Sequence, residues 1–238
     1  MAHDYSTTLE AADPYCLRGG EAATLLAGHP WKRFVVLGDS VAEGIGDRVE
    51  GYDALPFPDR LAAELTRRQP ELAYLNLGRR NLRTAQVRAQ QLGPALAFGP
   101  DLALVVCGAN DALRPGYEAR AEAVDRELAA MVRALLDHGA HVLTVSLFVL
   151  SSYPGVPAWL RAAFRQRMRL LARRTTAVAA TLGTIHVDLA AHPAGADPDM
   201  QSGDGLHGNG RSQAIAAAQA VRRLGAHLGN TFPTEPRA

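Results

Sequence analysis

Cysteine and lysine are scarce in this 238-residue sequence. Its only cysteines are Cys16 and Cys107, and its only lysine is Lys32. Two cysteines form at most one bridge, so the sequence excludes the dense disulfide framework of small secreted domains. The 25 basic residues balance 24 acidic ones, and no net charge favours nucleic acid or an anionic membrane as a partner. No apolar run approaches the roughly 18 residues of a membrane span, and residues 1–20 lack the apolar stretch of a signal peptide. We therefore expect a cytoplasmic protein without a membrane span.

The sequence alternates short apolar runs with longer amphipathic segments, and 47% of its residues are apolar. The apolar runs predict strands at 33–37, 72–77, 101–107, 141–147 and 184–187, and the amphipathic segments predict helices at 55–69, 84–92, 118–137, 157–182 and 210–224. This alternation predicts one three-layer α/β domain with a parallel sheet over residues 1–238. Its core is expected at about 31–228, with residues 1–30 wrapping the edge without a strand and 229–238 as a tail.

A serine follows the first predicted strand, in the sequence Gly38-Asp39-Ser40. In parallel α/β sheets, ligands bind outside the carboxyl ends of the strands, so this serine lies where a site is expected. A serine at a strand-to-helix junction presents both its hydroxyl and its backbone N–H to a ligand. The alternative is that Ser40 only caps the following helix.

Two further polar loops follow the second and third predicted strands. Gly78 permits close approach of the backbone to a ligand, to which its N–H can donate, although an ordinary turn glycine has the same appearance. Asn110 carries an amide that can donate to an oxyanion, and the alternative is an Asx turn with a helix cap. Both residues are candidates for an oxyanion hole.

Near the C-terminus, Asp204 precedes His207 by three residues. One turn can then bring the carboxylate to Nδ1 and leave Nε2 free to take a proton from a serine hydroxyl. A metal site or a solvated turn is the alternative, but the chain has neither a His/Cys cluster nor an H-E-x-x-H helix. No metal is therefore expected, and Asp188, at the end of the fifth predicted strand, is a rival for the orienting acid.

Together these loops resemble the signature of the SGNH/GDSL hydrolase superfamily, over roughly residues 34–215. The resemblance implies that Ser40 is the nucleophile, with Asp204 and His207 as acid and base. It places Gly78 and Asn110 at the oxyanion-hole donors, and the match extends to Asp39, Glu43, Gly44 and Asp111, with Asp39 expected to support the site. The sequence departs from the family pattern at Asn81, where many members have another glycine, and at Gly208, where proline often follows the histidine.

The resemblance also implies a flavodoxin-like sandwich with a five-stranded parallel sheet and a serine esterase or deacylase that needs no cofactor. The expected partner is a small or medium carboxylic ester, on a sugar or a secondary metabolite. An acyltransferase or cyclase with the same acyl-enzyme, and a binding module without activity, are the alternatives. The aromatic and proline-rich segment 148–159 is a candidate apolar wall for the substrate. The sequence gives no indication of the oligomeric state.

Overall fold

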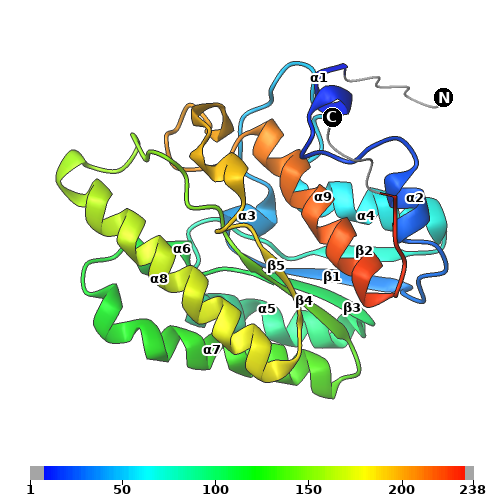
Figure 1. Ribbon diagram of the computed structural model, residues 1–238. Coiled ribbons are helices and arrows are strands. Elements are labelled where there is room, and N and C mark those ends of the chain that lie inside the picture. The colour runs from blue at the N-terminus through cyan, green and yellow to red at the C-terminus, as the bar shows by residue number, and fades with distance from the viewer. Residues whose placement is uncertain (1–7, 234–238) are drawn as a thin grey trace.

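A parallel five-stranded sheet lies at the centre of the computed structural model, which describes residues 8–233 (Figure 1). Its strands are β1 (Arg33–Gly38), β2 (Ala73–Asn76), β3 (Leu102–Val106), β4 (His141–Ser146) and β5 (Ile185–Asp188). They lie in the order β2-β1-β3-β4-β5, and every neighbouring pair is parallel. The chain thus leaves β1 on one side to reach β2 and returns to the other side for β3, β4 and β5. This reversal opens a crevice beyond the carboxyl ends of β1 and β3, where such sheets bind ligands.

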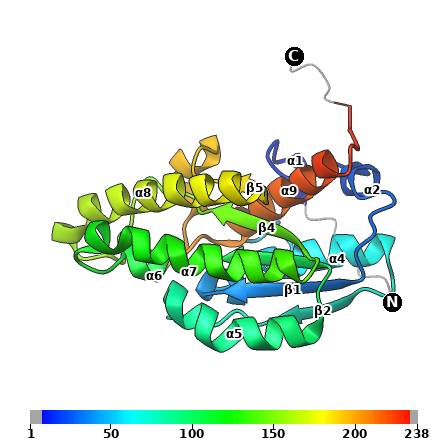
Figure 2. The same ribbon diagram turned by 90° about the horizontal axis from the view of Figure 1, so that it is seen from below.

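Helices cover both faces of the sheet (Figure 1). One face carries α2 (Glu21–Leu25), α4 (Phe57–Arg68) and α9 (Gly210–His227), and the other carries α5 (Thr84–Phe98), α7 (Tyr117–Asp137) and α8 (Ala158–Leu182). Helices α7 and α8 lie side by side in both views (Figures 1 and 2). Because successive strand residues point to opposite faces, Phe34 and Val36 pack in the α4/α9 core, while Val35 and Leu37 pack in the α5/α7 core. All four side chains are buried, which explains the uninterrupted apolar run in the sequence.

Shorter elements gather outside these two layers. They are α1 (Thr8–Ala12), α3 (Ser40–Glu43), α6 (Ala109–Ala112) and the 3₁₀ turns η1 (Pro193–Ala196) and η2 (Pro198–Met200). Two of them, α3 and α6, directly follow β1 and β3, so they begin at the crevice. None of the helices within residues 8–233 is long and apolar enough to cross a lipid bilayer.

The α/β class and the five-stranded parallel sheet expected from the sequence are confirmed. Two expected helices end too early: the helix expected over 210–224 continues to His227, and the helix expected over 84–92 continues through Pro94 to Phe98. Pro94 lies on the exposed side of α5, whereas Ala95 is fully buried against the sheet, so packing continues past the predicted stop. Burial of an apolar face stabilises most protein helices more than local propensity does.

The segment before β1 contains no strand in its described part. Helix α2 packs against α9, and a Cβ on Gly225 of α9 would lie 2.7 Å from the Leu25 side chain. Glu21 Oε1 accepts a hydrogen bond from Arg222 Nε at 2.7 Å, which ties the same two helices together. Residues 1–7 of the expected wrap and 234–238 of the expected tail lie outside the described residues.

Candidate active site

Ser40 begins α3 directly after β1, at a turn where β1 approaches β3 closely. A Cβ built on Gly38 would lie 1.9 Å from the Val106 carbonyl oxygen, so only glycine allows this approach. The Gln91 side chain of α5 holds the same residue: its Oε1 accepts from the Gly38 N–H at 2.8 Å, and its Nε2 donates to the Gly38 carbonyl at 2.9 Å. Ser40 is thereby fixed at the crevice and is largely buried.

His207 lies within hydrogen-bonding distance of both Ser40 and Asp204. Its Nε2 is 2.8 Å from Ser40 Oγ, and its Nδ1 is 2.6 Å from Asp204 Oδ2. Asp204 Oδ1 accepts the backbone N–H groups of Leu206 at 2.9 Å and His207 at 3.0 Å. Burial acts to raise the pKa of Asp204, but the hydrogen bonds from His207 and the backbone outweigh it and lower the pKa. An ionised Asp204 bonded to Nδ1–H leaves Nε2 as the acceptor of the Ser40 hydroxyl proton.

The turn that carries Asp204 and His207 is fastened to the loop that follows α3. Asp47 Oδ2 accepts from the Gly203 N–H at 2.6 Å, and the Asp47 N–H donates to Ser202 Oγ at 2.9 Å. The Ser202 N–H in turn donates to the His207 carbonyl at 2.9 Å. The sequence indicated 47–58 as a candidate substrate loop, but it did not predict that Asp47 and Ser202 hold the histidine turn, because no local pattern marks residues that meet across more than 150 positions.

Asp39 is fully buried beneath the site and caps α3. Its Oδ1 accepts the Val41 N–H at 3.1 Å, while Oδ2 has no hydrogen-bond partner of normal geometry in residues 8–233. Burial raises the pKa of Asp39 to about 7, against the opposing effects of the Val41 N–H and the nearby His207. Asp39 therefore supports the Ser40 turn from inside the protein and titrates near neutrality.

The geometry around Gly78 differs from the expected oxyanion-hole role. Its N–H already donates to Asn76 Oδ1, at 2.8 Å. A Cβ on Gly78 would lie 2.4 Å from the Ala42 carbonyl carbon and 2.4 Å from the Glu43 nitrogen. Glycine is thus required here for packing against α3, and the expectation that Gly78 provides a free donor does not fit the structure.

Asn81 occupies the position where sequence analysis noted only a departure from the family pattern. It is the one non-glycine residue with positive φ in the described chain, at 68°, a conformation that asparagine tolerates better than most residues. Asn81 lines the same cavity as Ser40, and neither backbone N–H donates to another described residue. Asn110 lines this cavity too; one of its amide hydrogens is bonded to the Leu82 carbonyl at 3.0 Å, and the second remains for a ligand.

A cavity of about 310 Å³ has Ser40, Asn110 and His207 in its wall. The remainder of the wall is mostly apolar. The apolar lining consists of Val41, Ile45, Phe57, Ala109, Leu113, Val145, Leu147, Phe148, Leu150, Tyr153, Phe164, Met168, Leu189, Leu206 and Ala216. An apolar chamber joined to a small polar group is the usual form of a small-molecule site, in which the polar groups fix orientation.

Two sequence expectations about the surroundings have different outcomes. Of the segment expected to form an apolar wall, Phe148 and Tyr153 line the cavity, but Trp159 is 78% exposed and does not. Asp188, the rival acid, lies in a different cavity, and its Oδ1 accepts the Ala190 N–H at 3.0 Å. No group of three or more potential metal-ligating side chains occurs within residues 8–233.

Comparison with known proteins gives a family for the chain and structures with a similar fold. The family model described as the GDSL-like lipase/acylhydrolase family matches residues 36–215. An alpha/beta hydrolase enzyme from the metagenome of Lake Arreo, Spain, has a similar structure, with a TM-score of 0.65 and 18% identity over 85% of this chain and 98% of that one. An acetylxylan esterase from Geobacillus stearothermophilus gives a TM-score of 0.62 and 18% identity over 85% and 96%. No curated protein sequence matches the chain significantly.

Proposed function

Because the chain belongs to the GDSL-like lipase/acylhydrolase family, and so to ester-hydrolysing serine hydrolases, we propose that it cleaves a carboxylic ester through an acyl-enzyme on Ser40. One observation carries this proposal: the hydrogen-bonded series from Ser40 Oγ to His207 Nε2 at 2.8 Å, and from His207 Nδ1 to Asp204 Oδ2 at 2.6 Å. A serine hydroxyl needs an oriented base to become nucleophilic at neutral pH, and this series supplies one.

In the first half of the reaction, Ser40 Oγ attacks the ester carbonyl carbon while His207 Nε2 takes the hydroxyl proton. Asp204 holds the imidazole in the required tautomer and stabilises the imidazolium, without taking the proton itself. The tetrahedral intermediate then collapses, the bond to the leaving alcohol breaks, and His207 protonates the alcohol. In the second half, water loses a proton to His207 and attacks the acyl-enzyme, which releases the acid and restores Ser40.

The developing oxyanion requires hydrogen-bond donors placed before the reaction begins. We assign the Ser40 N–H, the second amide hydrogen of Asn110 and the Asn81 N–H to this task. All three residues line the cavity, and both backbone groups lack an acceptor in the described residues. Asn81 takes the place that the sequence alone assigned to Gly78, whose N–H is bonded to Asn76.

The apolar cavity indicates which part of the ester it receives. Its wall contains no charged side chain that could pair with a polar substituent apart from Arg80 and Asp204. Arg80 is itself paired with Glu43, at 2.9 Å. We therefore propose that the cavity takes a hydrocarbon chain of several carbons, on either the acyl or the alcohol side. A sugar or other polar alcohol would remain at the solvent side.

The proposal is tested with p-nitrophenyl esters and a fluorophosphonate label, on the wild-type protein, Ser40→Ala and the exposed control Ser151→Ala. We expect Ser40→Ala to abolish labelling and to reduce kcat by at least about 10³-fold, while Ser151→Ala behaves as wild type. Asn110→Ala is expected to lose roughly 2.7–4 kcal/mol of transition-state stabilisation. Equal labelling of wild type and Ser40→Ala would refute the mechanism. Product analysis with a competing alcohol separates hydrolysis from acyl transfer.

A further inference from the structure

Helix α8 has a one-sided charge that the active site does not explain. It contains six arginines and no acidic residue in Ala158–Leu182. The arginines are Arg161, Arg165, Arg167, Arg169, Arg173 and Arg174. The protein as a whole carries a formal net charge of only +1, so the charge of α8 is a local feature.

Four of the six have partners within the described residues. Arg167 Nε bonds to Glu118 of α7 at 2.8 Å, and Arg174 Nη2 pairs with Asp125 at 2.6 Å. Arg161 donates to the Val156 carbonyl at 2.8 Å, and Arg165 donates to the carbonyl of Ser151. These contacts use the arginines to join α8 to α7 and to the segment before α8.

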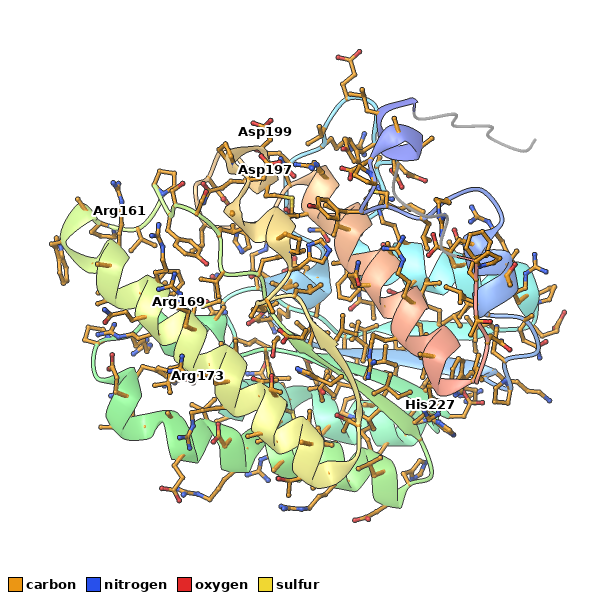
Figure 3. The ribbon with its side chains drawn as sticks, viewed as in Figure 1. Arg161, Arg169, Arg173, Asp197, Asp199 and His227 are labelled. Carbon is orange, nitrogen blue, oxygen red and sulfur yellow. The ribbon has the colours of Figure 1, made fainter. Side chains whose placement is uncertain are left out.

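Arg169 and Arg173 are different. Both are exposed, and neither donates a hydrogen bond or forms an ion pair within residues 8–233. They lie four residues apart on the same side of α8, where like charges destabilise a helix. Figure 3 shows them following Arg161 along α8. An anionic ligand would remove this repulsion.

The two arginines line a groove of about 730 Å³ together with Arg165. The groove lies between α8 and the segment that follows β5. Asp188 is its one acidic lining residue, and the Asp188 Oδ1 is engaged by the backbone N–H groups of Ala190 and Ala191. Three guanidinium groups thus face one carboxylate, so the groove carries net positive charge.

This groove is separated from the active site by the chain that follows β4. Phe148 faces the active-site cavity, Val149 faces the groove, and Leu150 lines both. A ligand in the groove therefore does not occupy the place of the ester, and its binding does not depend on Ser40.

We propose that the α8 groove binds a phosphate group. A guanidinium presents a planar fork of N–H donors that matches two phosphate oxygens, and a doubly charged phosphate offers enough acceptors for more than one arginine. The phosphate belongs either to a soluble phosphate ester or to the headgroup of a lipid. Both sources present the same chemistry to Arg169 and Arg173.

Binding is measured with the full chain against inorganic pyrophosphate and glycerol 3-phosphate by calorimetry, and against vesicles of phosphatidylcholine with or without phosphatidylglycerol by sedimentation. Arg169→Gln and Arg173→Gln are each expected to weaken binding at least about tenfold, the lower end of the contribution of one hydrogen bond to a charged group. Arg133→Gln, which removes an exposed arginine of α7, is the matched control and should bind as wild type. Asp188→Asn should bind more tightly, because it removes the opposing charge.

Binding of the soluble phosphates that is weakened in both variants supports the proposal with a soluble ligand. Binding only to phosphatidylglycerol vesicles, weakened in the same variants, supports it with a lipid headgroup. No binding in either arm by the wild-type protein, or wild-type affinity in both Arg169→Gln and Arg173→Gln, overturns it. Ser40→Ala should bind phosphate as the wild-type protein does. The binding test therefore remains valid even if the proposed hydrolase mechanism is refuted.

Discussion

Replacement of Asp39 by asparagine tests whether a fully buried carboxyl group beneath the nucleophile titrates near neutral pH. In the wild-type protein, the Val41 N–H donates to Asp39 Oδ1 at 3.1 Å. Asparagine has nearly the same shape as aspartate and keeps an oxygen that can accept this hydrogen bond. It is also as good a helix N-cap as aspartate. The substitution therefore removes the ionisable group while α3 and the turn before it keep their main contact.

The size of the effect follows from the pKa. Burial raises the pKa of Asp39 to about 7, from 3.8 for an exposed carboxyl. The folded protein then binds this proton more tightly than the unfolded chain, so the contribution of Asp39 to the free energy of unfolding falls as pH rises from about 4 to about 7. The loss amounts to about 4 kcal/mol at 1.36 kcal/mol per pKa unit. Asparagine does not titrate, so Asp39→Asn avoids this loss.

The asparagine amide carries its own cost, because the buried position of Asp39 Oδ2 offers it no hydrogen-bond partner of normal geometry in the described chain. An unpaired buried donor costs about 1–3 kcal/mol, and this cost does not vary with pH. We therefore expect the variant to be less stable than wild type at pH 4 and to gain on it by about 4 kcal/mol up to pH 8.

Urea unfolding, followed by the fluorescence of the buried Trp31, gives both free energies at each pH between 4 and 8. Asp199→Asn is the control, since it exchanges one exposed side chain for another. A difference between wild type and Asp39→Asn that stays constant across this range would refute the reasoning. It would mean that Asp39 ionises in the folded protein as readily as in the unfolded chain.

Three further predictions concern the site. Asp47→Ala removes the acceptor of the Gly203 N–H and so loosens the turn that carries His207. We expect kcat to fall about ten- to hundredfold with little change in KM, whereas Asp47→Asn should keep most of the wild-type kcat. Asn81→Gly keeps both the positive φ and the backbone donor, so its kcat should stay near the wild-type value. Gly78→Ala adds a Cβ against the backbone of α3, and its free energy of unfolding in urea should be lower by about 1–3 kcal/mol. With p-nitrophenyl esters of increasing acyl length, the wild-type kcat/KM should rise up to about fourfold per added methylene. Met168→Trp should lower the ratio of octanoate to acetate activity. A wild-type kcat/KM that does not change with acyl length would contradict an apolar substrate cavity.

The strands and the polar residues that follow them were accessible to sequence reasoning for a simple physical reason. A strand covered by helices on both faces has an uninterrupted apolar run, as β1 has from Phe34 to Leu37 and β3 has from Leu102 to Val106, and such a run stands out in the sequence. Because the strands are parallel, their carboxyl ends share one edge, and the residues after β1 and β3 must be near each other. The sequence alone therefore predicts that Ser40 and Asn110 lie close together, and both residues line the same cavity.

The residues that hold this site in place show no comparable pattern in the sequence. Gln91 lies within α5 and forms hydrogen bonds with Gly38, which is 53 positions away. Asp47 forms a hydrogen bond with Ser202 of the histidine turn, which is more than 150 positions away. An isolated glutamine or aspartate has many possible partners, and only the three-dimensional packing selects one. The helix end at Phe98 was missed for the same reason, because burial of Ala95 outweighed the local effect of Pro94.

The exchange of roles that we propose between Gly78 and Asn81 illustrates how far residue type alone can guide such reasoning. Glycine suggests a backbone that approaches a ligand, yet at Gly78 the close neighbour is the backbone of α3, 2.4 Å from a Cβ that glycine lacks. Asparagine suggests a side-chain role, yet at Asn81 the distinguishing feature is a backbone with φ of 68°. Glycine and asparagine are the residues that most readily adopt this conformation, so either can present an N–H from the same turn. Under this proposal the donor is a property of the loop conformation, and a sequence with asparagine in place of glycine at this position keeps a backbone N–H for the oxyanion.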